Sequence, residues 1–218
     1  LRTALTAAIQ PLYEYVQTFS QFEEQHQLQP EKYVADLDGA AADQEPMDAE
    51  ALRAEIFSLR EKEAELKGRI PESATVSIFK INIRDIRTFY ALKYGTIIEK
   101  LIKLISKRAI DANYRITTEF GAITERIQTP PKNIQELTDT KKYLSEIGIT
   151  IEKLKTEIDQ CMRTYDICGE FQHEFTGGEN DDKWKLFGAP QRIMEAIESQ
   201  TATLEKQKEA FIKAMELE

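Results

Sequence analysis

One proline-free segment, Ile83 to Gln128, constrains the fold of this chain more than any other stretch. Its large apolar residues recur at steps of three and four, with one longer gap around Lys93 and Tyr94, which is the period of an α-helix. A helix of about 46 residues would extend roughly 69 Å at about 1.5 Å per residue. The apolar positions are Ile86, Phe89, Tyr90, Ile97, Ile98, Leu101, Leu104, Ile105, Ala112, Ile116, Phe120, Ile123 and Ile127.

A helix of this length cannot bury its apolar stripe against itself. The backbone entropy that is lost on ordering is recovered only when partner helices cover the stripe. Helical proteins meet this need with antiparallel neighbours joined by short connections. We therefore expect the rest of the chain to supply long helical partners.

The composition is that of a helix-rich protein with a charged surface. Of 218 residues, 41% are hydrophobic and 31% are charged, with only nine glycines and seven prolines. The net charge of −9 disfavours a nucleic-acid-binding surface. No run approaches the roughly 20 apolar residues of a membrane span, and the first residues lack the pattern of a signal peptide. We expect no nucleic-acid and no membrane partner, and both ends look like points inside a longer polypeptide.

The N-terminal segment, 1–70, is expected to contain two helices joined by a flexible loop at 27–48 that has no sustained period, with a short turn of helix near 32–37 as an option. The first helix spans about 1–25, where Pro11 either begins a new helix or kinks a continuous one. Asp48 is the predicted N-cap of the second helix, whose apolar residues recur at helical spacing. Charged residues cover its other faces, which indicates an amphipathic helix in a bundle or a coiled coil.

Residues 71–83 are expected to connect this segment to the rest of the chain. Phe79, Ile81 and Ile83 alternate with polar residues, which is the period of a β-strand. The pattern predicts a short extended segment near 76–83. Because a single strand needs an edge to pair with, we expect its partner strand to lie outside this chain.

Residues 84–218 are expected to form a long three-helix antiparallel bundle, with helices at 83–128, 133–174 and 190–218. Asn133, with a glutamate three residues later, resembles a capping box at the start of the second helix. The predicted fold class is all-α, an elongated antiparallel helical bundle or bundles with one short extended segment. The predicted core stripe comprises Ile97, Leu101, Leu104, Ile105, Ile151, Leu154, Ile158, Ile193, Ile197 and Leu204.

A turn at 177–182, with two glycines followed by acidic residues, is the clearest turn signal in the chain. Trp184 and Phe187 follow it, just before the break at Pro190 where the last helix is expected to start. These three residues are predicted to form a structural elbow. We expect the single tryptophan to be a buried plug that closes the end of the bundle, in preference to an exposed contact for a partner.

No motif in the sequence carries catalytic chemistry. There is no Walker-type phosphate loop, and the acidic residues after the glycine pair would repel phosphate. His26 and His173 have no spacing that indicates a metal site. Cys161 and Cys168 lie too far apart along one predicted helix to bridge, and unpaired cysteines on an apolar face are usually buried. We expect no enzymatic activity, no cofactor and no metal, and a reducing intracellular setting.

Three stretches resemble, in order and spacing, the tail of dynein heavy chains. In RIPESATVSIFKINIRDIRTFYALKYGTIIEKLIKLI, an isoleucine-proline pair precedes a β-rich strand and a long helix. PPKNIQELTDTKKYLSEIGITIEKLKTEIDQCMRTYDICGEFQHEF has a P-x-[NT]-I-x-E-L start and leads to a Tyr-Asp pair, and NDDKWKLFGAPQRI is similar to a D-D-x-x-W elbow. Ala189 departs from the aromatic residue that often precedes the elbow proline. The matching positions are Pro131, Ile134, Glu136, Leu137, Tyr143, Ile147, Tyr165, Asp166, Asp181, Asp182, Trp184 and Pro190.

The opening, PLYEYVQTFSQFEEQHQLQPEKYVADL, is similar to the tail segment just upstream, so the resemblance covers nearly the whole chain. It is better to axonemal than to cytoplasmic heavy chains. It implies a non-catalytic tail segment just N-terminal to the linker of an AAA+ microtubule motor, whose ring and stalk lie far downstream. The implied role is a force-transmitting scaffold between the motor and its cargo or the axonemal doublet. The implied partners are the rest of the heavy chain and associated intermediate or light chains, in the cytoskeleton of a cilium or flagellum.

A spectrin-like three-helix repeat of a cytoskeletal crosslinker is the alternative. Such repeats are entirely helical and have longer continuous helices. The extended segment near 76–83 and the break at Gly148 in the second bundle helix therefore favour the dynein tail.

Overall fold

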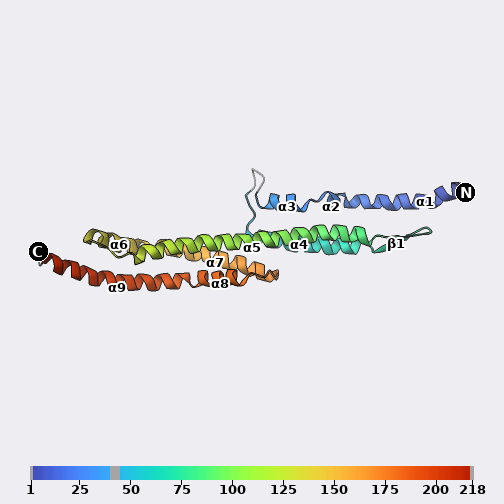
Figure 1. Ribbon diagram of the computed structural model, residues 1–218. Coiled ribbons are helices and arrows are strands. Elements are labelled where there is room, and N and C mark those ends of the chain that lie inside the picture. The colour runs from blue at the N-terminus through green and yellow to red at the C-terminus, as the bar shows by residue number, and fades with distance from the viewer. Residues whose placement is uncertain (1, 40–44, 217–218) are drawn as a thin grey trace. The chain divides into compact units, whose positions relative to one another are not determined.

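The computed structural model describes the backbone of residues 2–39 and 45–216, and the side chains of residues 7, 9–39 and 45–209 (Figure 1). The described chain is helical apart from one antiparallel hairpin, so the predicted all-α class is confirmed. The chain divides into two compact units, Leu1–Ile105 (unit 1) and Ser106–Glu218 (unit 2).

The division falls within the long helix α5 (Arg84–Gln128), whose bounds match the predicted helix to within one residue. The expected boundaries, after residues 70 and 83, therefore differ from the observed one. The reason is that two successive sets of partners cover the stripe of α5. Its first part packs within unit 1 and its second part within unit 2.

Unit 1 begins with short helices that lie along a longer helical pair. Its helices before the hairpin are α1 (Arg2–Gln17), η1 (Thr18–Phe22), α2 (Glu23–Gln27), α3 (Pro30–Leu37) and α4 (Ala49–Arg69). α1 is continuous through Pro11, so the alternative of a new helix starting there is wrong. The Asp48 side chain accepts a 2.7 Å hydrogen bond from the backbone N–H of Ala51, which confirms the predicted cap of α4. Residues 40–44 of the predicted loop at 27–48 lie outside the described residues, and α3 occupies part of the rest.

The extended segment is a hairpin of β1 (Ser73–Val76) and β2 (Phe79–Asn82). The register places Val76 opposite Phe79 and Ser73 opposite Asn82. The prediction that the strand pairs outside this chain is therefore wrong, because β1 is its partner. The two-residue loop begins at Ser77 with φ of 56°, a conformation that hairpins usually give to glycine. Without that glycine the turn could not be recognised from the sequence.

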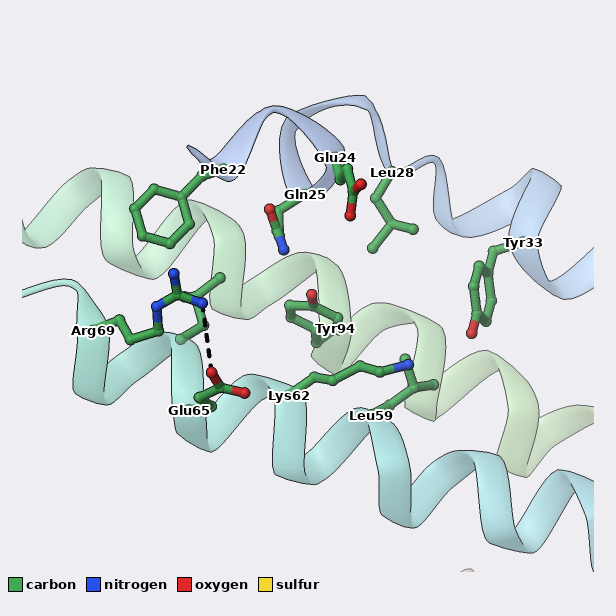
Figure 2. A pocket seen from close by; sticks show the side chains of 11 residues that line it. Phe22, Glu24, Gln25, Leu28, Tyr33, Leu59, Lys62, Glu65, Arg69 and Tyr94 are labelled. Atoms are coloured by element: carbon green, nitrogen blue, oxygen red, sulfur yellow. Dashed lines mark hydrogen bonds and ion pairs between the residues drawn. The ribbon is translucent and has the colours of Figure 1, made fainter. Parts of the chain in front are cut away.

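The core of unit 1 lies between α4 and the first part of α5, which run side by side (Figures 1 and 2). The apolar residues of α4 recur at helical spacing and are almost completely buried, since they face the stripe of α5. The buried residues of this pair include Leu52, Ile56, Leu59, Leu66, Tyr90, Tyr94, Ile97 and Leu101.

Unit 2 is an antiparallel bundle in which α7 returns along the second part of α5 and α8 with α9 reverse direction again (Figure 1). Its helices after α5 are α6 (Ile134–Glu146), α7 (Gly148–Glu170), α8 (Gly177–Phe187) and α9 (Ala189–Glu216). A single apolar cluster joins α5, α7, α8 and α9, and it includes Ala109, Ile116, Phe120, Ile127, Ile151, Leu154, Ile158, Cys161, Leu186 and Ile193.

Side-chain caps define the N-termini of α6 and α8 in unit 2. The Asn133 side chain accepts a 2.8 Å bond from the Glu136 N–H, so the predicted cap of α6 is confirmed. The predicted turn at 177–182 is wrong, because these residues form the first turns of α8. Thr176 and Glu179 form a capping box there, which satisfies the first N–H groups of α8 and outweighs the low helix propensity of two glycines.

Candidate functional site

A cavity of about 280 Å³ lies in unit 1 where η1, α2 and α3 approach α4 and α5 (Figure 2). Phe22 and Leu28 line it from the short helices, and Leu59 and Leu66 line it from α4. Charged side chains surround these apolar walls, and the ring of Tyr94 projects from α5 between them.

The two cations at this cavity, Arg69 and Lys62, are matched by partners within the protein. Arg69 lies 3.5 Å from Glu65, donates a 3.1 Å hydrogen bond to the Gln21 amide oxygen, and stacks over the Phe22 ring. Lys62 lies 3.9 Å from Glu55, so it too has an acidic neighbour. A charged ligand would have to compete with these contacts, and the arrangement therefore indicates packing rather than recognition of a charged molecule.

Tyr33 ties α3 to α4. Its hydroxyl donates a short hydrogen bond to the Glu55 carboxylate. Burial, followed by the contact with Glu55, raises the pKa of Tyr33 well above its usual value. The phenol is thus held as a neutral donor over the physiological pH range.

Lys93 of α5 holds the C-terminal end of α2. Its ammonium group donates to the backbone carbonyls of Gln25, at 3.2 Å, and of His26. These carbonyls belong to the last turn of a helix, where no N–H of the same helix pairs with them. Further along α5, Lys100 lies 3.2 Å from Glu31 at the start of α3. Directed polar contacts therefore attach α2 and α3 to the long helices.

Unit 2 contains a buried polar network within its apolar core. Asn113 of α5 is 4% exposed, and its amide nitrogen donates a 3.1 Å bond to the Tyr165 hydroxyl of α7. The Thr117 hydroxyl donates to the Asn113 amide oxygen at 3.0 Å. Sequence reasoning missed Asn113, although its place four residues after Ala109 and three before Ile116 puts it on the buried face.

Both cysteines are buried and unbridged in α7. Burial raises the pKa of each thiol to about 11, so thiolate formation is suppressed at neutral pH. The Cys161 thiol donates to the backbone carbonyl of Ala109 at 3.5 Å. The interpretation of Cys161 and Cys168 as core residues is confirmed.

The predicted plug at the elbow is wrong. Trp184 and Phe187 are 63% and 62% exposed and contact each other edge to face, with ring centroids 6.1 Å apart. Leu186 near the end of α8 and Ala189 at the start of α9 occupy the buried positions. Leu186 is two residues from Trp184 along α8, which places it on another face of the helix than the exposed indole. Pro190 lies in the first turn of α9 and is half-buried.

The predicted core-stripe residues lie in both units. Leu104 and Ile197 are half-buried. The remaining eight are buried, and they are Ile97, Leu101, Ile105, Ile151, Leu154, Ile158, Ile193 and Leu204. The structure brings together those of unit 2, except that Leu204 lies further along α9, beside the half-buried Leu144 of α6.

Neither a metal cluster nor a membrane helix is found in the part of the chain that the structure describes. Among the side chains described, those of residues 7, 9–39 and 45–209, no group of three or more His, Cys, Asp or Glu could hold a metal ion. No helix in those ranges is both long and apolar enough to cross a membrane.

No protein-family model matches the chain. Curated relatives include dynein axonemal heavy chain 1 of Mus musculus and of Homo sapiens, each 25% identical over 143 residues. The aligned part covers 66% of this chain but only 3% of either relative. The chain thus corresponds to a small part of a very long protein. The chain is similar to axonemal dynein heavy chains, as its motifs predict.

Proposed function

We propose that this chain is a non-catalytic tail segment of a dynein heavy chain and that it transmits force between the motor and its attachment. The observation that carries the proposal is the similarity to axonemal heavy chains over 143 residues. The helical architecture supports it, because interleaved apolar side chains along packed helices resist bending better than a flexible linker does.

The whole parent protein would then be an AAA+ microtubule-motor ATPase that works in the axoneme of a cilium or flagellum. Its linker and motor ring would follow this segment, and intermediate, light or other tail-binding chains would dock on it. These partners follow from the family that the chain resembles.

Electron microscopy of the full-length heavy chain tests the proposed position. An antibody fragment raised against this chain serves as the label. We expect the label on the tail, away from the ring and the microtubule-binding stalk. A label on the ring or on the stalk would contradict the proposed role.

A nucleotide titration of the chain tests the non-catalytic assignment separately. We expect no saturable ATP binding in calorimetry at millimolar nucleotide. Micromolar affinity would overturn this part of the proposal.

A spectrin-like repeat remains the second candidate because both proteins would be helical scaffolds. The hairpin at 73–82 and the joint between α6 and α7 favour the dynein tail over an uninterrupted three-helix repeat. Tandem copies about 100 residues apart in the parent sequence would instead favour the spectrin-like alternative.

A further inference from the structure

An apolar groove borders β2 in unit 1. The groove measures about 510 Å³ and is lined by Ile81 and Ile83 at the strand, by Ile86 and Phe89 at the start of α5, and by Val16 of α1. Three of these apolar side chains are largely exposed to solvent. The exposed fractions of Val16, Phe89 and Ile86 are 64%, 48% and 43%. Clustered exposed apolar side chains of this kind mark interaction surfaces.

The edge of β2 beside this groove has unpaired backbone groups. Antiparallel pairs alternate between residues that bond to each other and residues whose N–H and C=O point outward. Val76 and Phe79 face each other beside the two-residue loop, and the Ile83 N–H bonds to the Glu72 carbonyl at 2.8 Å. Together these contacts identify the residues of the hairpin whose backbone groups bond across to the other strand. Lys80 and Asn82 are therefore the outward-facing residues of β2.

No third strand covers either edge of the hairpin within the described residues. The groove is lined by β2 and not by β1. A strand that paired with Lys80 and Asn82 would extend the apolar face formed by Ile81 and Ile83, because side chains alternate in the same way on neighbouring strands.

The charge at this edge indicates what kind of strand would fit. Lys80 and Arg84 are exposed and form no ion pair among the described residues, and Asp85 is the one acidic residue among those that line the groove. Pairing with a second copy would place these cations near their own equivalents, which is destabilising. A strand with acidic residues on its polar face would instead neutralise them.

We propose that the free edge of β2 is a docking site for an extended acidic segment of a partner protein, which adds to the hairpin as a third strand and places its apolar side chains in the groove. The site is defined by unit 1 alone and does not depend on the proposed tail function.

Selection of a 12-residue random peptide library on the 218-residue chain tests the site. We expect the enriched peptides to alternate apolar and acidic residues. The binding of the best peptide is then measured by fluorescence anisotropy on variants of the chain. A failure to enrich any peptide, or enrichment of peptides with the spacing of an amphipathic helix, would overturn the proposal.

Two proline variants separate the two edges of the hairpin. Lys80→Pro removes an outward N–H of β2 and leaves the hairpin's own hydrogen bonds intact, and Thr75→Pro does the same on β1. We expect Lys80→Pro to weaken binding at least about tenfold and Thr75→Pro to change it less than about twofold. Equal effects would overturn the assignment of the edge. Lys80→Gln, which keeps the N–H, is expected to weaken binding less than Lys80→Pro and to reduce its salt dependence.

A second matched pair tests the groove. Phe89→Ala should weaken binding by about tenfold, whereas Leu92→Ala, at an exposed position of α5 outside the groove, should not. Circular dichroism confirms that each variant is folded.

Sedimentation of the unliganded chain tests whether a second copy occupies the edge of β2. A dimer that Lys80→Pro disrupts would mean that a second copy occupies the edge, which contradicts the proposed partner.

Discussion

The two units use different interactions to hold their helices together. In unit 2, apolar side chains from four helices form one buried cluster. In unit 1, α4 and α5 share a buried seam, but the short helices beside them contribute little to it. Of the side chains described between residues 7 and 39, only Phe22 is fully buried. Lys93, Tyr33 and Lys100 attach those short helices by polar contacts instead.

This difference predicts different responses to perturbation. Apolar burial is non-directional and distributes stability over a whole cluster, so unit 2 should unfold cooperatively. A few directed contacts at half-exposed sites contribute less, so α2 and α3 should open locally while α4 and α5 stay folded. Four experiments test this difference between the two units.

Truncating the core of unit 2 should have the largest effect. Leu154 is 1% exposed within the cluster, so Leu154→Ala should lower the free energy of unfolding by about 2–5 kcal/mol. Denaturant unfolding followed by circular dichroism measures it. Ile149→Ala on the same helix, where the side chain is exposed, should cost less than about 0.5 kcal/mol. Similar costs for both variants would mean that the cluster does not hold unit 2 together.

Breaking the buried polar network should cost somewhat less. Tyr165→Phe removes the acceptor of the Asn113 amide within the core, and an unsatisfied buried donor costs about 1–3 kcal/mol. The matched control is Tyr114→Phe on the exposed face of α5. If the two variants are equally stable in urea, water or another group must satisfy Asn113.

Removing the lysine that holds α2 should act locally in unit 1. Lys93→Met keeps most of the aliphatic chain but loses the donors to Gln25 and His26. We expect the opening free energy of α2 and α3 to fall by about 1–2 kcal/mol. Amide hydrogen exchange should rise there and stay unchanged in α4. Lys103→Met, which loses only an exposed pair with Glu99, is the control. Faster exchange throughout unit 1 would show that the short helices are not a separate opening unit.

Relieving backbone strain should give the smallest effect, and a stabilising one. Gln172 follows α7 with φ of 58°, and the bonds from Gln172 N–H to Gly169 and from His173 N–H to Cys168, both 3.0 Å, form a Schellman motif. Gln172→Gly should stabilise unit 2 by about 1 kcal/mol, because glycine adopts this conformation without the Cβ penalty. Calorimetry should show a higher Tm.

Ser77→Gly is the equivalent change in unit 1, at the hairpin loop. Because it lies outside the seam of α4 and α5, it should leave the main unfolding transition of unit 1 nearly unchanged. A shift as large as that of Gln172→Gly would mean that the hairpin unfolds together with the seam.

Several features of the fold could be predicted because they depend on local sequence. The bounds of α5 follow from a helical period that continues on both sides of one longer gap, and from the prolines after the segment. The caps at Asp48 and Asn133 follow from side chains that bond to N–H groups two or three residues away. The burial of the cysteines follows from their place on the apolar face of α7.

Other features depend on contacts that are distant in sequence. A glycine inside a helix often marks a bend or a close neighbour, yet an added Cβ would meet no atom within 4 Å at Gly95 or Gly121 of α5. The exposure of Trp184 and the burial of Asn113 depend on how α8 and α5 are rotated toward their neighbours. The positions of the helices and the apolar stripe of each could be predicted from the amino-acid order, since periodicity is a property of one segment. The partner that covers each stripe depends on the tertiary fold, because burial requires a second surface that no local pattern specifies.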